Sequence, residues 1–239
     1  MLSLFFIPAI PADNSVTVDG DEAHHAIKVM RMAVGDEVLL ADGGGAWARA
    51  RITDIDKKSF SASIAEHGIE IDETPELVVG QALTKSDRTK ESMELLVEAG
   101  VNRIIPWQAE RSIAKWKDDS GEKYHQAART AAKQSRRFTV PQIDHPMSTS
   151  ELAKLAGPGT LVLVFHESAE VKLSEVFATQ QIYTSIICLI GPEGGVSESE
   201  LELLSASGAH IVKLGKQVLR SAHAGIAALI AVQTLIGRL

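Results

Sequence analysis

Cysteine is almost absent from this sequence: Cys188 is the single one among 239 residues. That count excludes an intrachain disulfide and a cysteine-based zinc site, and it is typical of a reducing compartment such as the cytosol. The apolar segment 224–236 is too short to span a membrane, so we expect a buried helix there. Residues 1–12 are apolar but lack a basic region, which favours a first β-strand over a signal peptide. The sequence therefore predicts a cytoplasmic protein.

Positive charge is also scarce: the sequence has 24 lysines and arginines but 31 acidic residues, which gives a net charge of −7. The distribution is uneven, however: residues 85–137 hold 12 basic against 8 acidic residues, whereas residues 1–84 hold 6 against 14. Salt screens charges beyond about 10 Å at 0.1 M, so a local basic face can bind phosphates whatever the total charge. A nucleic-acid surface and a plain solvated helix face both remain open at this point.

The first seventy residues predict a small β-barrel, because short alternating strands are separated by turn residues and only one helix, 22–30, interrupts them. The run Asp42-Gly-Gly-Gly45 predicts a hairpin turn between two of the strands. The expected strands are 4–7, 16–18, 37–40, 47–52 and 59–64.

After the polar break at 72–75 the pattern changes to strands that alternate with helices, as in an α/β domain. Two segments, 160–165 and 185–190, are almost wholly apolar and predict buried parallel strands. We expect a boundary between residues 73 and 74, with domains 1–73 and 74–239. The other expected elements are strands 77–83, 102–106 and 210–214 and helices 90–99 and 122–137.

The stretch GPEGG, residues 191–195, follows one of these strands and resembles a phosphate loop without its lysine. Its only charge, Glu193, would repel a phosphate. Ser197-x-x-Glu200 predicts a capping box, so a helix begins directly after the loop. A neutral or cationic ligand, such as an adenosine that carries a sulfonium, fits such a loop; the alternative is a tight turn without a ligand.

Two more loops follow apolar strands. His166 comes after strand 160–165, and Gly215 and Arg220 follow strand 210–214. Ligands of open α/β sheets lie at the carboxyl ends of parallel strands. The sequence therefore predicts that three loops form one ligand site.

Two stretches, LIGPEGGVSESEL from Leu189 and KLGKQVLRSAHAGIAAL from Lys213, resemble the SPOUT class of α/β-knot methyltransferases. Earlier motifs resemble the RsmE-type enzymes of that class, which methylate uridine N3 in small-subunit ribosomal RNA. These motifs are HH at 24–25 with Arg31, VGD at 34–36, ALTKSDR at 82–88, E-x-GV at 98–101, ERS at 110–112 and A-x-QS-x-R at 132–137.

The resemblance covers nearly the whole chain and implies an enzyme: an N-terminal PUA-like β-barrel and a C-terminal α/β trefoil-knot domain with a parallel sheet. It further implies S-adenosylmethionine as methyl donor, a homodimer, and 16S ribosomal RNA as substrate. We expect the assembled small subunit to be the substrate, because a structured target lets two domains dock at once, and we expect no metal, because His24-His25 has no Cys or acidic partner at ligand spacing. The alternatives are a SPOUT enzyme that acts on another nucleotide or on a ribose 2′-OH, and a non-catalytic RNA-binding module.

With this resemblance, three sets of residues are expected to form the site. The cofactor set is His166, Gly191, Glu193, Gly195, Leu214, Gly215, Leu219 and Ser221. Arg220 is the leading catalytic candidate and Arg136 the second. The RNA-binding set is Lys28, Arg31, Lys85, Arg88, Arg111, Lys133 and Arg137.

The sequence departs from the family pattern directly after Arg220. The family there has Thr-Glu-Thr-Ala or Thr-Ser-Thr-Ala, whereas this chain has Ser221-Ala222-His223-Ala224. A catalytic base at position 222 is therefore not required in this protein. His223 is a possible proton acceptor, although a packing role is favoured.

Overall fold

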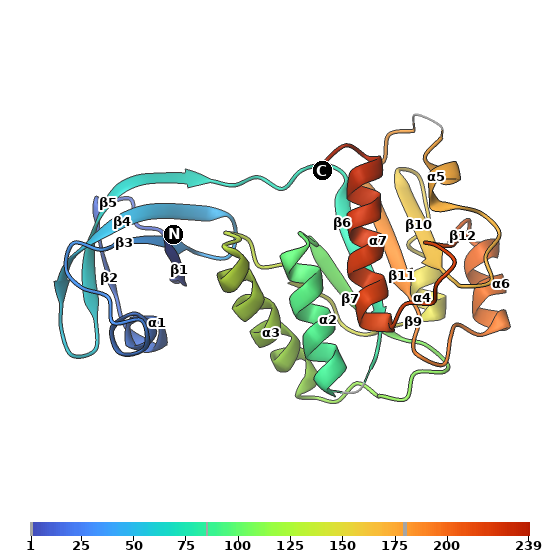
Figure 1. The fold of residues 1–239 in the computed structure, drawn as a ribbon, viewed down its shortest axis with the longest axis horizontal. Helices are drawn as coiled ribbons and strands as arrows, with labels where there is room; N and C mark the ends of the chain where they lie inside the picture. The colour runs from blue at the N-terminus through green and yellow to red at the C-terminus, as the bar shows by residue number, and fades with distance from the viewer. Residues whose placement is uncertain (1, 85, 179–180) are drawn as a thin grey trace. The chain divides into compact units, whose positions relative to one another are not determined.

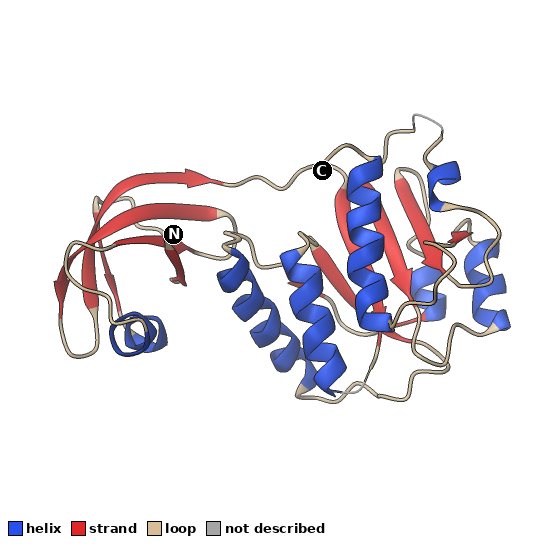
Figure 2. Cartoon of the chain, in the orientation of Figure 1, coloured by secondary structure: helices blue, strands red, loops and turns tan. Residues whose placement is uncertain are grey.

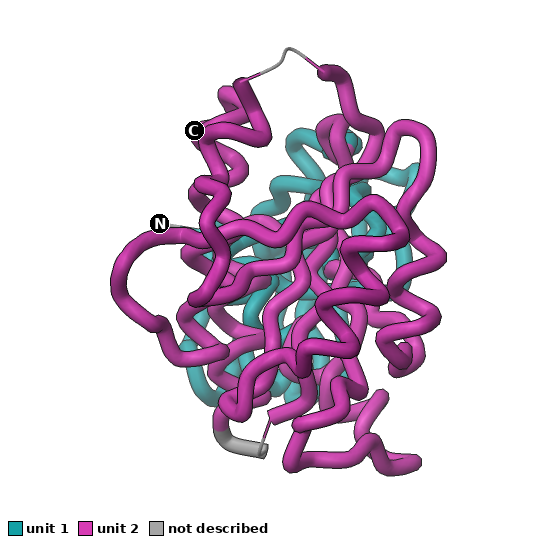
Figure 3. Tube along the Cα trace, turned by 90° about the vertical axis from the view of Figure 1, so that its right-hand side faces the viewer, with its two compact units in different colours: residues 1–71, 129–140 teal, residues 72–128, 141–239 magenta. Residues whose placement is uncertain are grey.

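A computed structural model describes residues 2–84, 86–178 and 181–239. The chain forms two compact units, drawn in separate colours in Figure 3. Unit 1 contains the residues up to Ile71 and also Arg129–Val140, and unit 2 contains Asp72–Ala128 and Pro141–Leu239. The first division lies close to the expected boundary, but the sequence did not predict that residues 129–140 belong to unit 1.

Unit 1 is built on a five-stranded sheet in the order β1-β3-β4-β5-β2. Its strands are β1 (Ser3–Phe6), β2 (Ser15–Val18), β3 (Glu37–Ala41), β4 (Ala46–Ile55) and β5 (Phe60–Ile69). β1 pairs with β3 in parallel and the other pairs are antiparallel. In β4, Ala48, Ala50 and Ile52 are buried while Arg49 and Arg51 are exposed, as the alternation of a strand requires. Within the described residues no ladder joins β1 to β2.

The expected hairpin and helix of unit 1 are both present. Asp42 accepts hydrogen bonds from the backbone N–H of Gly44 and Ala46, at 2.7 and 3.1 Å, and so stabilises the turn between β3 and β4. The helix starts as α1 (Gly20–His24) and continues as the π-helix η1 (His25–Val29). Such π-turns are often found at functional sites, and η1 carries the RNA candidate Lys28.

The segment 129–140 packs on unit 1 through aromatic and charged side chains. Phe138 stacks on Trp47, with ring centroids 5.2 Å apart, and the guanidinium of Arg129 lies 4.6 Å from the ring centroid of Phe6. The backbone N–H of Val140 donates to the carbonyl of Gly43 at 2.9 Å. Helix α3 (Ser120–Ser135) therefore begins in unit 2 and ends in unit 1.

Unit 2 has a parallel seven-stranded sheet in the order β12-β10-β11-β6-β7-β8, and β9 also pairs with β7 (Figure 2). The predicted strands 160–165 and 185–190 have the expected bounds. The strands are β6 (Glu76–Ala82), β7 (Arg103–Gln108), β8 (Gln142–Ile143), β9 (Met147–Ser148), β10 (Thr160–Phe165), β11 (Ser185–Ile190) and β12 (His210–Val212).

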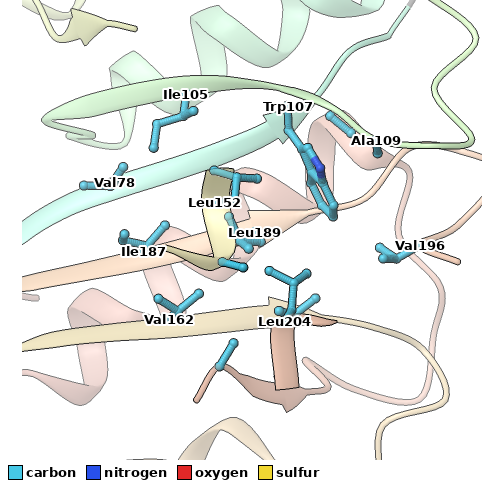
Figure 4. Packing of buried hydrophobic residues seen from close by; sticks show 14 residues of the cluster. Val78, Ile105, Trp107, Ala109, Leu152, Val162, Ile187, Leu189, Val196 and Leu204 are labelled. Atoms are coloured by element: carbon cyan, nitrogen blue, oxygen red, sulfur yellow. The ribbon is translucent and has the colours of Figure 1, made fainter. Parts of the chain in front are cut away.

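Helices cover both faces of this sheet. Helix α7 (Ser221–Leu235) packs on β6, β11 and α2 (Ser86–Glu98), and all of these lie side by side in Figure 1. On the other face, Leu152 of α4 (Thr149–Ala153) and Leu204 of α6 (Glu198–Ala206) pack with Trp107, Ile187 and Leu189 (Figure 4). A further short helix is α5 (Leu173–Val176). No helix among the described residues is long and apolar enough to cross a membrane.

Candidate functional site

The three expected ligand loops begin side by side at the carboxyl edge of the unit 2 sheet. Phe165, the last residue of β10, pairs with Ile190 of β11 on one side and with Val212 of β12 on the other. The loops that start at His166, Gly191 and Lys213 therefore leave adjacent strands at the same level. The backbone N–H of His166 donates to the carbonyl of Val212 at 2.9 Å, which holds two of the loops together.

The glycine loop is fixed by the helix that follows it. Ser197 and Glu200 form the predicted capping box: each side chain accepts from the backbone N–H of the other, at 3.4 and 3.1 Å. The buried Glu200 carboxylate also accepts from the N–H of Glu110 at 2.9 Å and from the hydroxyl of Thr149 at 2.5 Å. A buried charge requires such partners, so this network anchors the end of the loop to the rest of unit 2.

Two arginines from other parts of the sequence contact the middle of the glycine loop. Arg88 of α2 pairs with Glu193, with 2.6 Å between nitrogen and oxygen, and Arg111 donates to the carbonyl of Gly194 at 3.3 Å. The negative charge that would repel a phosphate is thus offset by Arg88. Both arginines were expected to bind RNA, and both lie at the expected cofactor loop. Lys85, another RNA candidate, lies outside the described residues.

The loop that follows β12 is open to solvent. Leu214 is half-buried, whereas Gly215, Leu219 and Arg220 are exposed. A Cβ atom added to Gly215 would meet no atom within 4 Å. Arg220 is the N-cap residue of α7, and its guanidinium forms no hydrogen bond or ion pair with the residues that the structure describes. A free cation therefore stands beside the positive end of the α7 dipole.

The start of α7 is tied to the glycine loop by Ser221. Its hydroxyl donates to the carbonyl of Gly191 and accepts from the side-chain amide of Gln81, both at 2.8 Å. Ser221 was expected to contact the cofactor; in the structure its hydroxyl proton is donated to the carbonyl of Gly191 in the glycine loop. Sequence reasoning missed Gln81, although a glutamine in an otherwise apolar strand is a detectable signal.

His166, a predicted cofactor contact, and His223, the candidate proton acceptor, have different surroundings. The ring of His166 is hydrogen bonded to the hydroxyl of Ser168 at 2.8 Å and remains at the sheet edge. His223 lies on the exposed side of α7, 3.4 Å from the carboxylate of Glu91 on α2. Among the described residues, no group of three or more His, Cys, Asp or Glu side chains is placed to hold a metal ion.

Lys133, one of the RNA candidates in unit 1, is engaged within the protein. Its ammonium forms an ion pair with Glu22 of α1 and lies 5.0 Å from the ring centroid of Phe5. Both charged side chains are about four-fifths buried, at 21% and 20% exposure. A phosphate would have to compete with Glu22 for this ammonium, and the RNA contact of Lys133 stays a prediction.

Two other candidates, Arg31 and Arg136, are the non-glycine residues with positive φ, 56° and 58°, in the described part of the chain. Each follows the end of a helix and is exposed. At the end of α3 the N–H groups of Arg137 and Arg136 donate to the carbonyls of Ala132 and Lys133, at 2.9 and 3.3 Å. This is a Schellman motif, in which glycine normally occupies the position that Arg136 holds.

Because a left-handed backbone costs an arginine about 1 kcal/mol that it does not cost glycine, we expect Arg136→Gly to raise the free energy of unfolding slightly. Arg136→Ala removes the same charge but retains the strain, so it should be neutral or destabilising. Urea unfolding of both variants compares them directly. A Gly variant less stable than the Ala variant would contradict this conformation at position 136.

A parallel α/β sheet with a lysine-free glycine loop at its carboxyl edge, preceded by a separate β unit, is the arrangement of SPOUT methyltransferases that carry a PUA domain. Family models agree: an RNA methyltransferase domain matches residues 72–233, and an RNA methyltransferase PUA domain matches residues 18–65. The chain belongs to the ribosomal RNA small subunit methyltransferase E family.

Individual relatives support this membership over the full length. Ribosomal RNA small subunit methyltransferase E of Mycobacterium bovis is 36% identical over 244 residues, which cover 98% of this chain and 92% of the relative. The Bacillus subtilis protein of the same name is 29% identical and is covered to 88%. The crystal structure of the Neisseria gonorrhoeae protein, bound to S-adenosyl methionine, is 26% identical and has a TM-score of 0.88 over 98% of both chains.

Proposed function

We propose that this protein transfers a methyl group from S-adenosylmethionine to N3 of a uridine in the 16S RNA of the small ribosomal subunit, in the cytoplasm. The observation that carries the proposal is the alignment of three loops at one sheet edge, in a chain that resembles a cofactor-bound relative over 98% of its length. The N3 position comes from the motif resemblance, and the named relatives support the RNA class.

The residues at this edge fit the cofactor. The glycine loop and the Gly215 loop offer backbone N–H and C=O groups for an adenosine, and the only carboxylate of the glycine loop, Glu193, is paired with Arg88. Gly215 leaves open space, since no atom lies within 4 Å of its Cβ position. S-adenosylmethionine supplies a methyl group on a cationic sulfur; the protein residues must position it and the base. His166, Gly191, Gly195, Leu214 and Leu219 complete this proposed site.

RNA contacts are proposed at arginines and lysines of both units. Arg88 and Arg111 flank the glycine loop in unit 2, and Lys28 and Arg31 lie at the end of η1 in unit 1. Arg137, at the end of α3, completes the set. Because phosphate contacts release counterions, binding should weaken as salt rises, by about one unit of log-log slope for each contact.

The function is tested by incubating the protein with labelled S-adenosylmethionine and either small subunits or naked 16S RNA, followed by mapping of the methylated nucleotide. Label at uracil N3 supports the proposal, and the two substrates show whether assembly is needed. Label on a ribose 2′-OH or another base indicates a different SPOUT specificity. RNA binding without cofactor binding indicates a non-catalytic module.

We further propose that the protein is a homodimer. Helix α7 keeps Ile230 and Leu235 exposed at 39% and 41%, and the loop before it exposes Val218 and Leu219 at 75% and 41%. A second copy would bury such apolar side chains. Sedimentation at micromolar concentration should give a particle of twice the chain mass; a single species of 25.7 kDa would exclude the dimer.

A further inference from the structure

A buried chain of three hydrogen bonds connects helix α2 to the glycine loop. The hydroxyl of Ser92 donates to the side-chain oxygen of Gln81 at 3.2 Å. The amide nitrogen of Gln81 donates to the hydroxyl of Ser221 at 2.8 Å, and Ser221 donates to the carbonyl of Gly191 at 2.8 Å. The three side chains belong to residues only 1%, 4% and 8% exposed, so solvent does not replace a lost partner.

The three hydrogen bonds all point in one direction, because the donor of each bond determines which group the next residue can donate. A serine hydroxyl has a single proton, so Ser221 can donate to Gly191 only if Gln81 presents its NH₂ group to the serine. Gln81 presents that group because its oxygen faces the donor Ser92. Were the amide reversed, Ser221 would donate to Gln81, and the Gly191 carbonyl would lose this donor.

The backbone leaves Gln81 little freedom to move. In the sheet, Gln81 pairs with Ile190, the residue directly before the glycine loop. From the side of α7, a Cβ atom on Gly225 would lie 3.0 Å from the Gln81 oxygen and 3.0 Å from Leu96. The absence of a side chain at position 225 therefore allows α7 to approach and enclose the amide.

We propose that Gln81 is a positioning residue for the methyl transfer: through Ser221 it orients the Gly191 carbonyl and the first turn of α7, which carries Arg220. Ser92 donates to the side-chain oxygen of Gln81 and so determines that the NH₂ group of the amide faces Ser221. This inference rests on the proposed function, because it presumes that Gly191 and Arg220 face the cofactor and the base. It assigns the role to residues that do not themselves touch either ligand.

The test compares two buried glutamines whose side chains are hydrogen bonded to different parts of unit 2. Gln81→Leu removes the link to the glycine loop. Gln233→Leu is the matched control: Gln233 lies in α7, is 8% exposed, and donates to the carbonyl of Ala99 at 2.8 Å, at the opposite end of that helix. Gln81→Leu removes two buried hydrogen bonds and Gln233→Leu removes one, so both should lower the melting temperature and Gln81→Leu should lower it more.

Only Gln81→Leu should change the site. By isothermal titration, its Kd for S-adenosylmethionine should rise about tenfold or more, while that of Gln233→Leu stays within about threefold of wild type. In methylation assays, kcat should fall for Gln81→Leu even at saturating cofactor, because Arg220 is displaced as well. Equal effects of the two variants on affinity and kcat would reduce Gln81 to a structural role and overturn the inference.

A change of similar size and shape separates orientation from packing. Gln81→Met fills nearly the same space but can neither accept from Ser92 nor donate to Ser221, so the loss of affinity should match that of Gln81→Leu. If both variants fail to fold, Ser92→Ala replaces them, with Ser207→Ala as control because the Ser207 hydroxyl donates to the carbonyl of Leu204, away from the glycine loop. Ser92→Ala should weaken binding about threefold; affinity equal to that of its control would overturn the inference.

The outcomes also separate this inference from the proposed function. If the wild-type protein does not bind S-adenosylmethionine, the function itself fails. If the wild type binds and methylates, and Gln81→Leu does both equally well, only the positioning role of Gln81 fails.

Discussion

Gly215→Val is expected to weaken S-adenosylmethionine binding by about a hundredfold or more and to leave the melting temperature almost unchanged. Gly215 follows β12 at the sheet edge, and an added Cβ meets no atom within 4 Å. The valine side chain therefore costs the fold nothing; it only fills the space in which the adenosine would lie. Isothermal titration and thermal unfolding of the same sample measure the two effects.

Gly157→Val provides the matched control. Gly157 is also exposed, its added Cβ also meets no atom within 4 Å, and it precedes β10, at the amino end of the sheet. Gly191 would be a poor choice, because a Cβ there would lie 2.7 Å from Val196 and disturb the loop itself. Cofactor affinity within twofold of wild type for Gly215→Val would show that the ligand lies elsewhere.

The parts of the fold that the sequence predicted are those that local pattern determines. Residues 160–165 and 185–190 have the predicted strand bounds because a continuous apolar run marks a strand that is covered on both faces. The capping box at Ser197 and Glu200 is likewise a four-residue signal. The position of the three loops at one edge then follows from the parallel sheet, since all its strands end on the same side, whereas the adjacency of their strands does not follow from it.

The parts that were missed depend on residues far apart in the sequence. Residues 129–140 join unit 1 through contacts such as Phe138 on Trp47, which no local pattern reveals. The same holds for Lys133, whose partner Glu22 is more than a hundred positions away. Short elements such as β8, β9, α4 and α5 contain too few residues to show a period.

Charge pairing also changes the interpretation of the glycine loop. The sequence predicted Glu193 as the only charge of the loop and Arg88 as a phosphate contact; in the structure the two side chains form an ion pair at 2.6 Å. Exposed pairs of this kind contribute little to stability, and their effect is largely local. Here the pair joins the start of α2, which carries proposed RNA contacts, to the proposed cofactor loop.

The chemical step sets the requirement for a cation near the base. Uracil N3 carries a proton and is a poor nucleophile until that proton leaves, and the charge that develops spreads to the neighbouring carbonyl oxygens. A fixed positive group beside such an oxygen stabilises the anion, most effectively where water is excluded. Arg220 fits this role because its guanidinium has no partner among the described residues and stands beside the N-terminus of α7.

We expect Arg220→Ala to slow single-turnover methylation by about a hundredfold, the scale found when one donor to a developing oxyanion is removed. Arg220→Lys should recover only part of the rate, because an ammonium lacks the planar pair of donors. A nearby cation lowers the pKa of N3, so its removal should also shift the rate profile toward higher pH. Rapid-quench assays at saturating RNA and cofactor, repeated across pH, measure both effects.

Lys216→Ala is the control, because Lys216 is an exposed cation in the same loop and its loss changes the net charge equally. It should alter RNA affinity at low salt but not the chemical rate. Arg136→Gly tests the second candidate without adding backbone strain, since position 136 has φ of 58°. If Arg220→Lys keeps the wild-type rate and pH profile while Arg136→Gly loses the rate at saturating RNA, the electrostatic role belongs to Arg136 and Arg220 serves only as the cap of α7.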